Sequence, residues 1–147
     1  MKSIARHGPA AARIAFGLVL VVFGLNGFLQ FLPQPAPPEA AGKFAGALFA
    51  TGYMFPLIKG VEVVVGALLL SNRFVPLALA LIAPNVVNIL LFHIFLAPSE
   101  IGLALIVLAL ELYLAWAYRD AYASMLAPRV RPRSTRGEEP VSAHAHA

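Results

Sequence analysis

Four apolar segments separated by short polar connections dominate the pattern of the chain. A helix needs about 20 apolar residues to cross the hydrocarbon core of a bilayer, and each segment is close to that length. The predicted spans are residues 14–32, 53–71, 74–96 and 101–118. Segment 39–52 is shorter, with small and mildly apolar residues, and it predicts an interfacial helix in the first outer loop. The pattern predicts an all-α integral membrane protein, a four-helix bundle with one short interfacial helix.

Composition supports this class and narrows the chemistry. Hydrophobic residues make up 60% of the 147 residues and charged residues 12%, with a mean hydropathy of +0.79, which excludes an ordinary soluble domain. The length leaves room for one small bundle. The chain has no cysteine, so it can hold no disulfide, cysteine-ligated iron–sulfur cluster or thiolate zinc site. A redox role would therefore depend on a bound molecule or a partner protein.

Lysine and arginine gather before the first span, in the 71–73 turn and after the fourth span, whereas only Lys43 lies in the first connection. The positive-inside rule then predicts a multi-pass protein of the cell membrane with both termini cytoplasmic. We expect three parts: a basic cytoplasmic N-terminus (1–12), a membrane domain (13–127) and a disordered basic cytoplasmic tail (128–147). The tail histidines, His144 and His146, are too few to predict a metal site. A signal peptide is the alternative interpretation of the first segment.

Lys59 and Glu62 are two charges inside the second apolar span. A lone charge at mid-bilayer costs at least about 2.5 kcal/mol, so ionisable residues there usually pair or line a polar cavity. Residues three apart lie on the same side of a helix, so the two side chains can form an ion pair that faces the bundle. We expect the opposite surface, which faces lipid, to comprise Val61, Val64, Val65 and Leu68.

The other spans place polar side chains at a comparable depth. At 1.5 Å per residue, Lys59 and Glu62 lie about 9 to 14 Å from the outer end of their helix. The same count places the other polar groups between mid-depth and the outer end: Asn26 and Gln30 on the first span, Asn85, Asn88 and His93 on the third, and Glu111 on the fourth. We predict one pocket toward the outer leaflet. Its ionisable candidates are Lys59, Glu62, Glu111 and His93, and its lining candidates are Asn26, Gln30, Asn85 and Asn88. The alternatives are interhelical hydrogen bonding by Asn85 and Asn88, a purely structural ion pair in place of a functional pocket, and an interfacial position for His93.

Several short stretches, in order along all four spans, resemble the DoxX family of small four-helix membrane proteins. They are Arg13–Gly17, Phe23–Gly27, Thr51–Glu62, Ala83–Asn85, Asn88–His93 and Glu111–Trp116. The resemblance covers residues 13–127. It implies an accessory subunit of a membrane redox system, because the family takes its name from a subunit associated with a quinone-reducing, thiosulfate-oxidising complex. Many relatives have a lysine near the position of Asn26, so the neutral amide here argues against an anion-binding role.

Two classes of function follow from the resemblance and the pocket. In the first, the chain is a quinone-linked redox accessory subunit in which Lys59 hydrogen-bonds a quinone oxygen. Glu62 or Glu111 then carries a proton, and His93 passes it toward the outer face. In the second, it is a non-enzymatic binder or transporter of a small amphiphile, or a structural partner of another membrane protein. The expected partners are the bilayer and a redox protein, with a homo-oligomer left open. We expect no covalently bound cofactor, metal or nucleic acid, and whether the chain is an enzyme stays open.

Overall fold

The computed structural model describes the backbone of residues 2–33 and 35–129 and the side chains from residue 7 onward. Regular structure within these ranges is entirely helical, which confirms the all-α prediction for them. The α-helices are α1 (Lys2–Leu29), α2 (Glu39–Ala50), α3 (Met54–Leu70), α4 (Val75–Leu96) and α5 (Ile101–Ala117), with 3-10 turns η1 (Pro98–Glu100) and η2 (Arg119–Tyr122). Residues 130–147, which include His144, His146 and most of the predicted tail, lie outside the described residues.

Three helical segments are long and apolar enough to cross a membrane, as expected of a membrane protein. They are His7–Leu29, Val75–Leu96 and Pro98–Ala117. Helix α3 has 17 residues and passes the same test only together with α2, from which it is bent by 93°. The structure thus has three candidate spans, or four if the bent pair forms one span.

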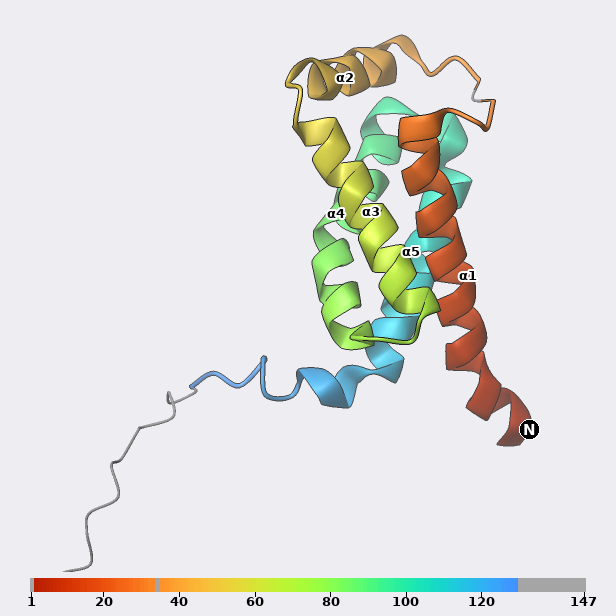
Figure 1. Cartoon of the computed structure of the whole chain (residues 1–147), viewed down its shortest axis with the longest axis vertical. Helices are drawn as coiled ribbons and strands as arrows, with labels where there is room; N and C mark the ends of the chain where they lie inside the picture. Colours follow the sequence, from red (N-terminus) through yellow and green to blue (C-terminus); the bar gives the residue numbers. More distant parts are fainter. Residues whose placement is uncertain (1, 34, 130–147) are drawn as a thin grey trace, which may run out of the picture.

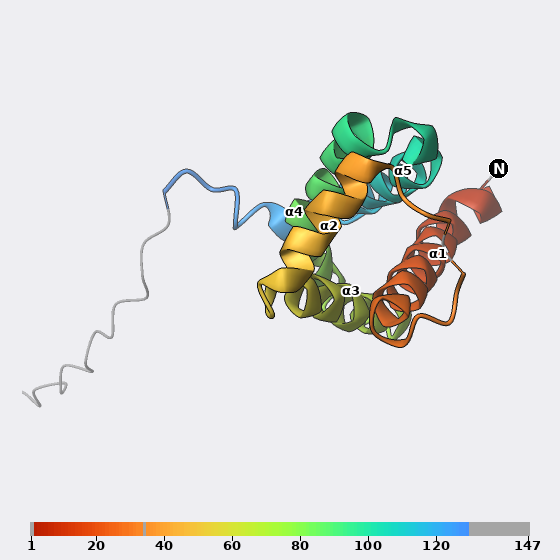
Figure 2. The ribbon, with the colours of Figure 1, turned by 90° about the horizontal axis from the view of Figure 1, so that it is seen from above.

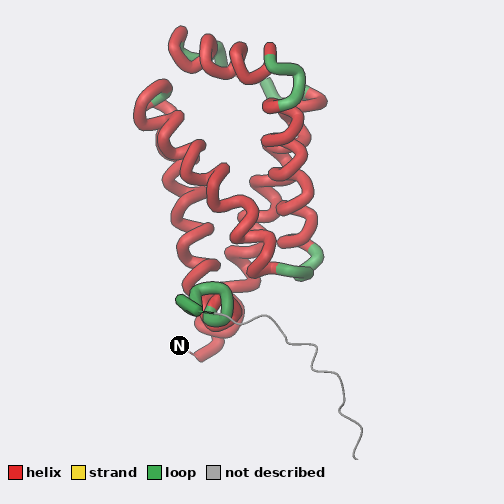
Figure 3. The backbone as a smooth tube through the Cα atoms, turned by 90° about the vertical axis from the view of Figure 1, so that its left-hand side faces the viewer, coloured by secondary structure: helices red, strands yellow, loops and turns green. Residues whose placement is uncertain are grey.

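Helices α1, α3, α4 and α5 run side by side, and α2 lies across one end of them (Figure 1). Seen from above, α2 crosses over the ends of α3 and α4 (Figure 2). We call this the α2 end. The opposite end, which we call the termini end, holds the start of α1, the turn between α3 and α4, and the end of α5 (Figure 3).

The apolar core lies closer to the termini end. Its largest fully buried side chains include Phe16, Leu69, Leu79, Ile82 and Leu114, so that each of the side-by-side helices α1, α3, α4 and α5 contributes one or two. Leu69 is the penultimate residue of α3, Leu79 is in the second turn of α4, and Leu114 is in the last turn of α5. The core thus brings α1, α3, α4 and α5 together at this end.

One part of the predicted lipid-facing surface is wrong. Val65 is only 1% exposed, whereas Val64 is 58% exposed as expected of a lipid-facing residue. Residues three apart share a helix face, so Val65 lies on the same inward side as Glu62. Val61 and Leu68 pack partly buried against the core. The outward face of α3 is therefore narrower than predicted.

Helices α1 and α3 approach closely where glycines face each other. A Cβ added at Gly66 would lie 2.9 Å from the Gly17 carbonyl oxygen and 2.7 Å from Val21 Cγ2. Contacts this short would force the backbones apart, so glycine is required for the observed spacing. Small residues allow this kind of close helix packing in membranes. The tight α1–α3 contact fixes which side of α3 faces the interior.

Arg13 is a buried part of this contact, although the sequence pattern placed it before the first span. Its side chain is 8% exposed, and its guanidinium donates to the backbone carbonyl of Leu69 and, at 3.5 Å, to that of Leu70. The last carbonyls of a helix have no partner within the helix. Arg13 therefore caps the end of α3 and ties it to α1.

Candidate functional site

Lys59 and Glu62 form the predicted ion pair on α3. Lys59 Nζ lies 2.9 Å from Glu62 Oε2 and 3.2 Å from Oε1, so the ammonium donates to both oxygens of the carboxylate. The Glu62 side chain is 4% exposed and that of Lys59 is 22% exposed. A carboxylate this buried needs a cation beside it. The pairing prediction is confirmed.

Two glycines of α1 make room for this pair. A Cβ added at Gly24 would lie 3.1 Å from Glu62 Cβ, and one at Gly27 would lie 2.6 Å from Lys59 Cγ. The Lys59 stem therefore lies flat against α1 before its ammonium turns to Glu62. Larger residues at these two positions would displace the pair, so the α1 sequence contributes to the site without any polar group.

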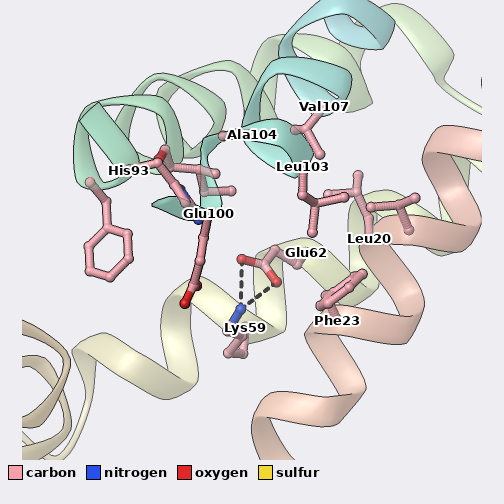
Figure 4. Close-up of a pocket in the computed structure, with 12 residues that line it drawn as sticks. Leu20, Phe23, Lys59, Glu62, His93, Glu100, Leu103, Ala104 and Val107 are labelled. Carbon is pink, nitrogen blue, oxygen red and sulfur yellow. Dashed lines mark hydrogen bonds and ion pairs between the residues drawn. The ribbon is translucent and has the colours of Figure 1, made fainter. Parts of the chain in front are cut away.

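A cavity of about 340 Å³, which we call the Lys59 pocket, lies beside this pair (Figure 4). Its walls are mostly apolar and come from α1, α4 and α5, including Leu20, Phe23, Phe92, Leu103 and Val107. Small-molecule sites typically combine such apolar walls with a few polar groups that orient the ligand. Among the described residues, only Lys59, Glu62, His93 and Glu100 contribute polar side chains to the lining. The cavity is thus an apolar chamber with its polar groups at the α2 end.

Glu100 is a lining residue that the sequence reasoning missed. It is the last residue of η1, and its side chain extends toward the Lys59–Glu62 pair (Figure 4). No hydrogen bond or ion pair to a described residue is formed by its carboxylate. Its position at the end of a short connection, at the same end of the bundle as Lys59, was the available signal. It was overlooked because Glu100 lies outside the apolar segments.

His93 lines the pocket from α4, as predicted, and its ring orientation follows from one contact. His93 Nδ1 lies 2.7 Å from the Ile89 carbonyl oxygen. A carbonyl oxygen only accepts hydrogen bonds, so Nδ1 carries the proton in this contact. The ring also packs edge-on against Phe92, with 5.3 Å between centroids. In neutral His93, Nε2 is then a free acceptor.

Lys59 also lines two neighbouring cavities. One, of about 580 Å³, lies under the 33–38 loop and includes Asn26, Gln30 and Glu100; the other, of about 200 Å³, lies between α2, α3 and α4 and includes Asn88. Asn26 is 8% exposed, and its Oδ1 accepts the Leu32 N–H at 2.7 Å, which closes the end of α1. Three of the four predicted lining residues therefore surround Lys59, although not in a single cavity.

Glu111 and Asn85 are not brought to these cavities, and neither lines any of the three. Glu111 is 6% exposed on α5, between the buried Val107 and Leu114. Its Oε2 and the Nδ2 of Asn85 are buried and have no hydrogen-bond partner among the described residues. Depth along a helix does not fix the direction of a side chain around the helix axis, and residues three apart on one helix, such as Asn85 and Asn88, can still differ in whether they reach a cavity.

A metal centre finds no support in the part of the chain that the structure describes, where no three histidine or acidic side chains lie together as ligands would. The chemistry available to the pocket is hydrogen bonding, proton exchange and the burial of an apolar group. Comparison with known proteins adds no assignment: no family model, curated protein or solved structure matches the chain.

Proposed function

We propose that the Lys59 pocket binds a small amphiphile with an oxygen-bearing head group, and that the protein is a DoxX-like accessory subunit of a quinone-linked membrane redox system. The observation that carries this proposal is the chamber of about 340 Å³ with apolar walls and one buried ion pair at its end. The chamber is large enough for a substituted aromatic ring, since small-molecule pockets start at about 300 Å³.

The polar groups suit such a head group. Lys59 Nζ has three N–H donors, and Glu62 accepts from it with both oxygens, which leaves a donor for a carbonyl oxygen of the ligand. His93 and Glu100 lie at the same end and are proton acceptors. Reduction of a quinone consumes electrons and protons in equal number. In this proposal a redox partner protein supplies the electrons, and the pocket residues hold the head group and exchange protons with it.

The proposal includes a membrane arrangement. Helices α1, α3, α4 and α5 form a four-helix bundle across the membrane, and α2 lies in the interface with its Glu39–Lys43 ion pair in water. Arg73, Arg119 and Arg129 all follow helix ends at the termini end, which supports a cytoplasmic position for that end.

A reporter that is active only after export tests this orientation. Fused after Ala147, it should stay inactive, whereas the same reporter inserted in the 33–38 loop should be active. Activity of the C-terminal fusion would show that the number of spans is odd or that the orientation is reversed.

Thermal unfolding with a short-chain quinone analogue tests the binding. We expect the analogue to raise the melting temperature of the wild type, by an amount that grows with the logarithm of its concentration above the dissociation constant. Lys59→Met should reduce this increase. Lys43→Met is the matched control, because Lys43 lies on α2 with an exposed side chain. Equal stabilisation of the wild type and Lys59→Met would contradict binding at Lys59.

Passage of a small amphiphile without redox chemistry is the second candidate. It is favoured by one observation: Lys59 lines all three cavities, and Phe23 and Glu100 line both larger ones. These cavities therefore adjoin between the 33–38 loop and the interior. Purification from native membrane separates the candidates, since a redox accessory subunit should co-purify with an electron-transfer protein. A purely structural partner role predicts a co-purifying membrane protein but no ligand.

A further inference from the structure

We infer that the Lys59 pocket selects head groups that donate hydrogen bonds, so that it binds a hydroquinone more tightly than the corresponding quinone, with Glu100 as the residue that sets this preference. The inference rests on the proposed function, and it assigns the ligand's redox form. Its basis is the balance of donors and acceptors among the four polar residues that line the chamber.

Donors are scarce in this pocket. Lys59 is the one lysine or arginine among the described lining residues, and its ammonium already donates to both oxygens of Glu62. The Nδ1 proton of His93 is used by the Ile89 carbonyl. The chamber therefore offers a ligand one uncommitted type of donor, the remaining N–H of Lys59.

Acceptors are more numerous and less satisfied. Glu100 presents a solvent-exposed carboxylate whose oxygens accept hydrogen bonds, and it forms no ion pair with a described residue. It reaches toward Lys59 from η1 (Figure 4). In its neutral form His93 adds a second acceptor, Nε2, because Nδ1 donates to the Ile89 carbonyl oxygen. With Glu62 already paired with Lys59, Glu100 leaves the lining of the chamber with one more acidic than basic side chain, counting Lys59 as the basic one.

A quinone and a hydroquinone differ in whether their oxygens can donate hydrogen bonds. Both oxygens of a quinone only accept, so one can use Lys59 while neither can pair with Glu100. A hydroquinone carries two O–H groups, which can donate to Glu100 and to His93 Nε2 while an oxygen still accepts from Lys59. Hydrogen bonds to charged groups are the stronger ones, so the hydroquinone should bind on the order of tenfold more tightly.

This preference has a redox consequence. Tighter binding of the reduced form raises the reduction potential of the bound couple. A tenfold preference corresponds to about 30 mV for a two-electron couple. The balanced half-reaction adds two electrons and two protons to the quinone, and the electrons come from the partner protein of the proposed function. The pocket would thereby favour reduction at this site and retain the product.

The experiment compares three probes of one ring and one short alkyl tail: the quinone, the hydroquinone and the hydroquinone dimethyl ether, which cannot donate. Dissociation constants are measured by titration calorimetry on the full chain in lipid nanodiscs, without oxygen. For the wild type we expect the hydroquinone to bind about tenfold more tightly than either other probe. Glu100→Gln should reduce this ratio at least several-fold, because the amide can donate to a quinone oxygen.

Two further variants keep the outcome interpretable. Glu39→Gln is the control, since Glu39 is, like Glu100, an exposed carboxylate, but it is paired with Lys43 and lies outside the three cavities; its ratio should equal that of the wild type. His93→Phe should lower hydroquinone affinity and leave quinone affinity unchanged. Equal affinities of the wild type for quinone and hydroquinone, or an unchanged ratio in Glu100→Gln, overturn this inference while the proposed function stands. If no probe binds the wild type, the proposed function itself fails, and the inference with it.

Discussion

The termini end and the α2 end of this protein differ in how their interiors are filled. At the termini end, Phe16, Leu69 and Leu79 are at most 1% exposed, and a backbone-to-backbone contact joins α1 to α3 at Gly17 and Gly66. At the α2 end, three cavities surround Lys59. Close packing stabilises a membrane helix bundle. The contrast indicates that the termini end holds the bundle together, whereas the α2 end leaves open volume around Lys59.

Charged side chains are used differently at the two ends. Arg13 donates to the last carbonyls of α3, so its donors complete the backbone hydrogen bonding. Lys59 instead bonds the carboxylate of Glu62 and borders open volume. Glu111 departs from this contrast, because it is buried among the apolar core residues and its Oε2 has no hydrogen-bond partner among the described residues.

The largest expected effect is on the ion pair at the α2 end. Lys59→Met leaves the Glu62 carboxylate buried without its cation. Breaking a fully buried pair costs about 3 to 5 kcal/mol, and the partial exposure of Lys59 places this case at about 3 kcal/mol or below. The free energy of unfolding in detergent should fall by that amount. Glu62→Gln should have a smaller effect, because it leaves no unpaired buried carboxylate.

The double variant Lys59→Met with Glu62→Gln checks whether the loss comes from the pair. It should recover about 1 kcal/mol or more of the summed single losses, since residues in contact couple by about 0.5 to 3 kcal/mol. Strictly additive losses would show that the two residues act independently. The Lys59–Glu62 ion pair would then contribute little to the stability of the α2 end.

The next effect belongs to the termini end. Gly66→Ala should lower the free energy of unfolding by about 1 to 3 kcal/mol, the usual range for overpacking, because its Cβ meets the backbone of α1. Gly60→Ala is the control in the same helix. A Cβ there meets nothing within 4 Å, so it should be neutral or stabilising by up to about 1 kcal/mol.

Gly27→Ala extends this test to the α2 end. Its Cβ would lie 2.6 Å from Lys59 Cγ, but it meets only this flexible side chain, which can move. We expect less than about 1 kcal/mol of destabilisation, below that of Gly66→Ala. A loss as large as that of Gly66→Ala would show that the α2 end is packed as rigidly as the other.

The sequence predicted most helix boundaries well because their signals are local, but the first helix begins at Lys2 and not at residue 14, where the apolar run starts. The 33–38 prolines, the 71–73 turn and the run of apolar residues on each side placed every helix boundary at the α2 end and the α3–α4 turn within a few residues. It also predicted the Lys59–Glu62 pair, because spacing by three residues guarantees proximity on a helix. These are properties of one segment at a time.

What the sequence did not predict depends on how the helices are rotated against each other. Rise per residue gave Glu111 a plausible depth. The direction of its side chain around the α5 axis, however, places it between Val107 and Leu114 in the apolar core. Glu100 was missed because a residue in a short connection has no depth or face until the flanking helices are placed. The contact at Gly17 and Gly66 is equally invisible in either segment alone.

The smallest expected effect concerns Tyr122, which closes the termini end. Its hydroxyl donates to the Pro76 carbonyl oxygen at 2.9 Å and so attaches η2 to the start of α4. Tyr122→Phe removes this hydrogen bond, and because the side chain is only partly buried, we expect a loss of about 0.5 to 1 kcal/mol. Tyr53→Phe is the control, since Tyr53 is 64% exposed at the other end.

The effect of Tyr122 should also depend on pH. Burial, and secondarily the negative charge of Glu111, raises the pKa of the Tyr122 phenol above its ordinary value of 10.0. The folded state then binds this proton more tightly than the unfolded state, so the contribution is present below about pH 10 and is lost as the pH rises through the folded pKa. Melting curves from about pH 8 to about pH 11 should therefore show a steeper alkaline loss for the wild type than for Tyr122→Phe. Parallel alkaline losses would mean that Tyr122 is as accessible in the folded protein as in the unfolded chain, and that η2 is not held against α4.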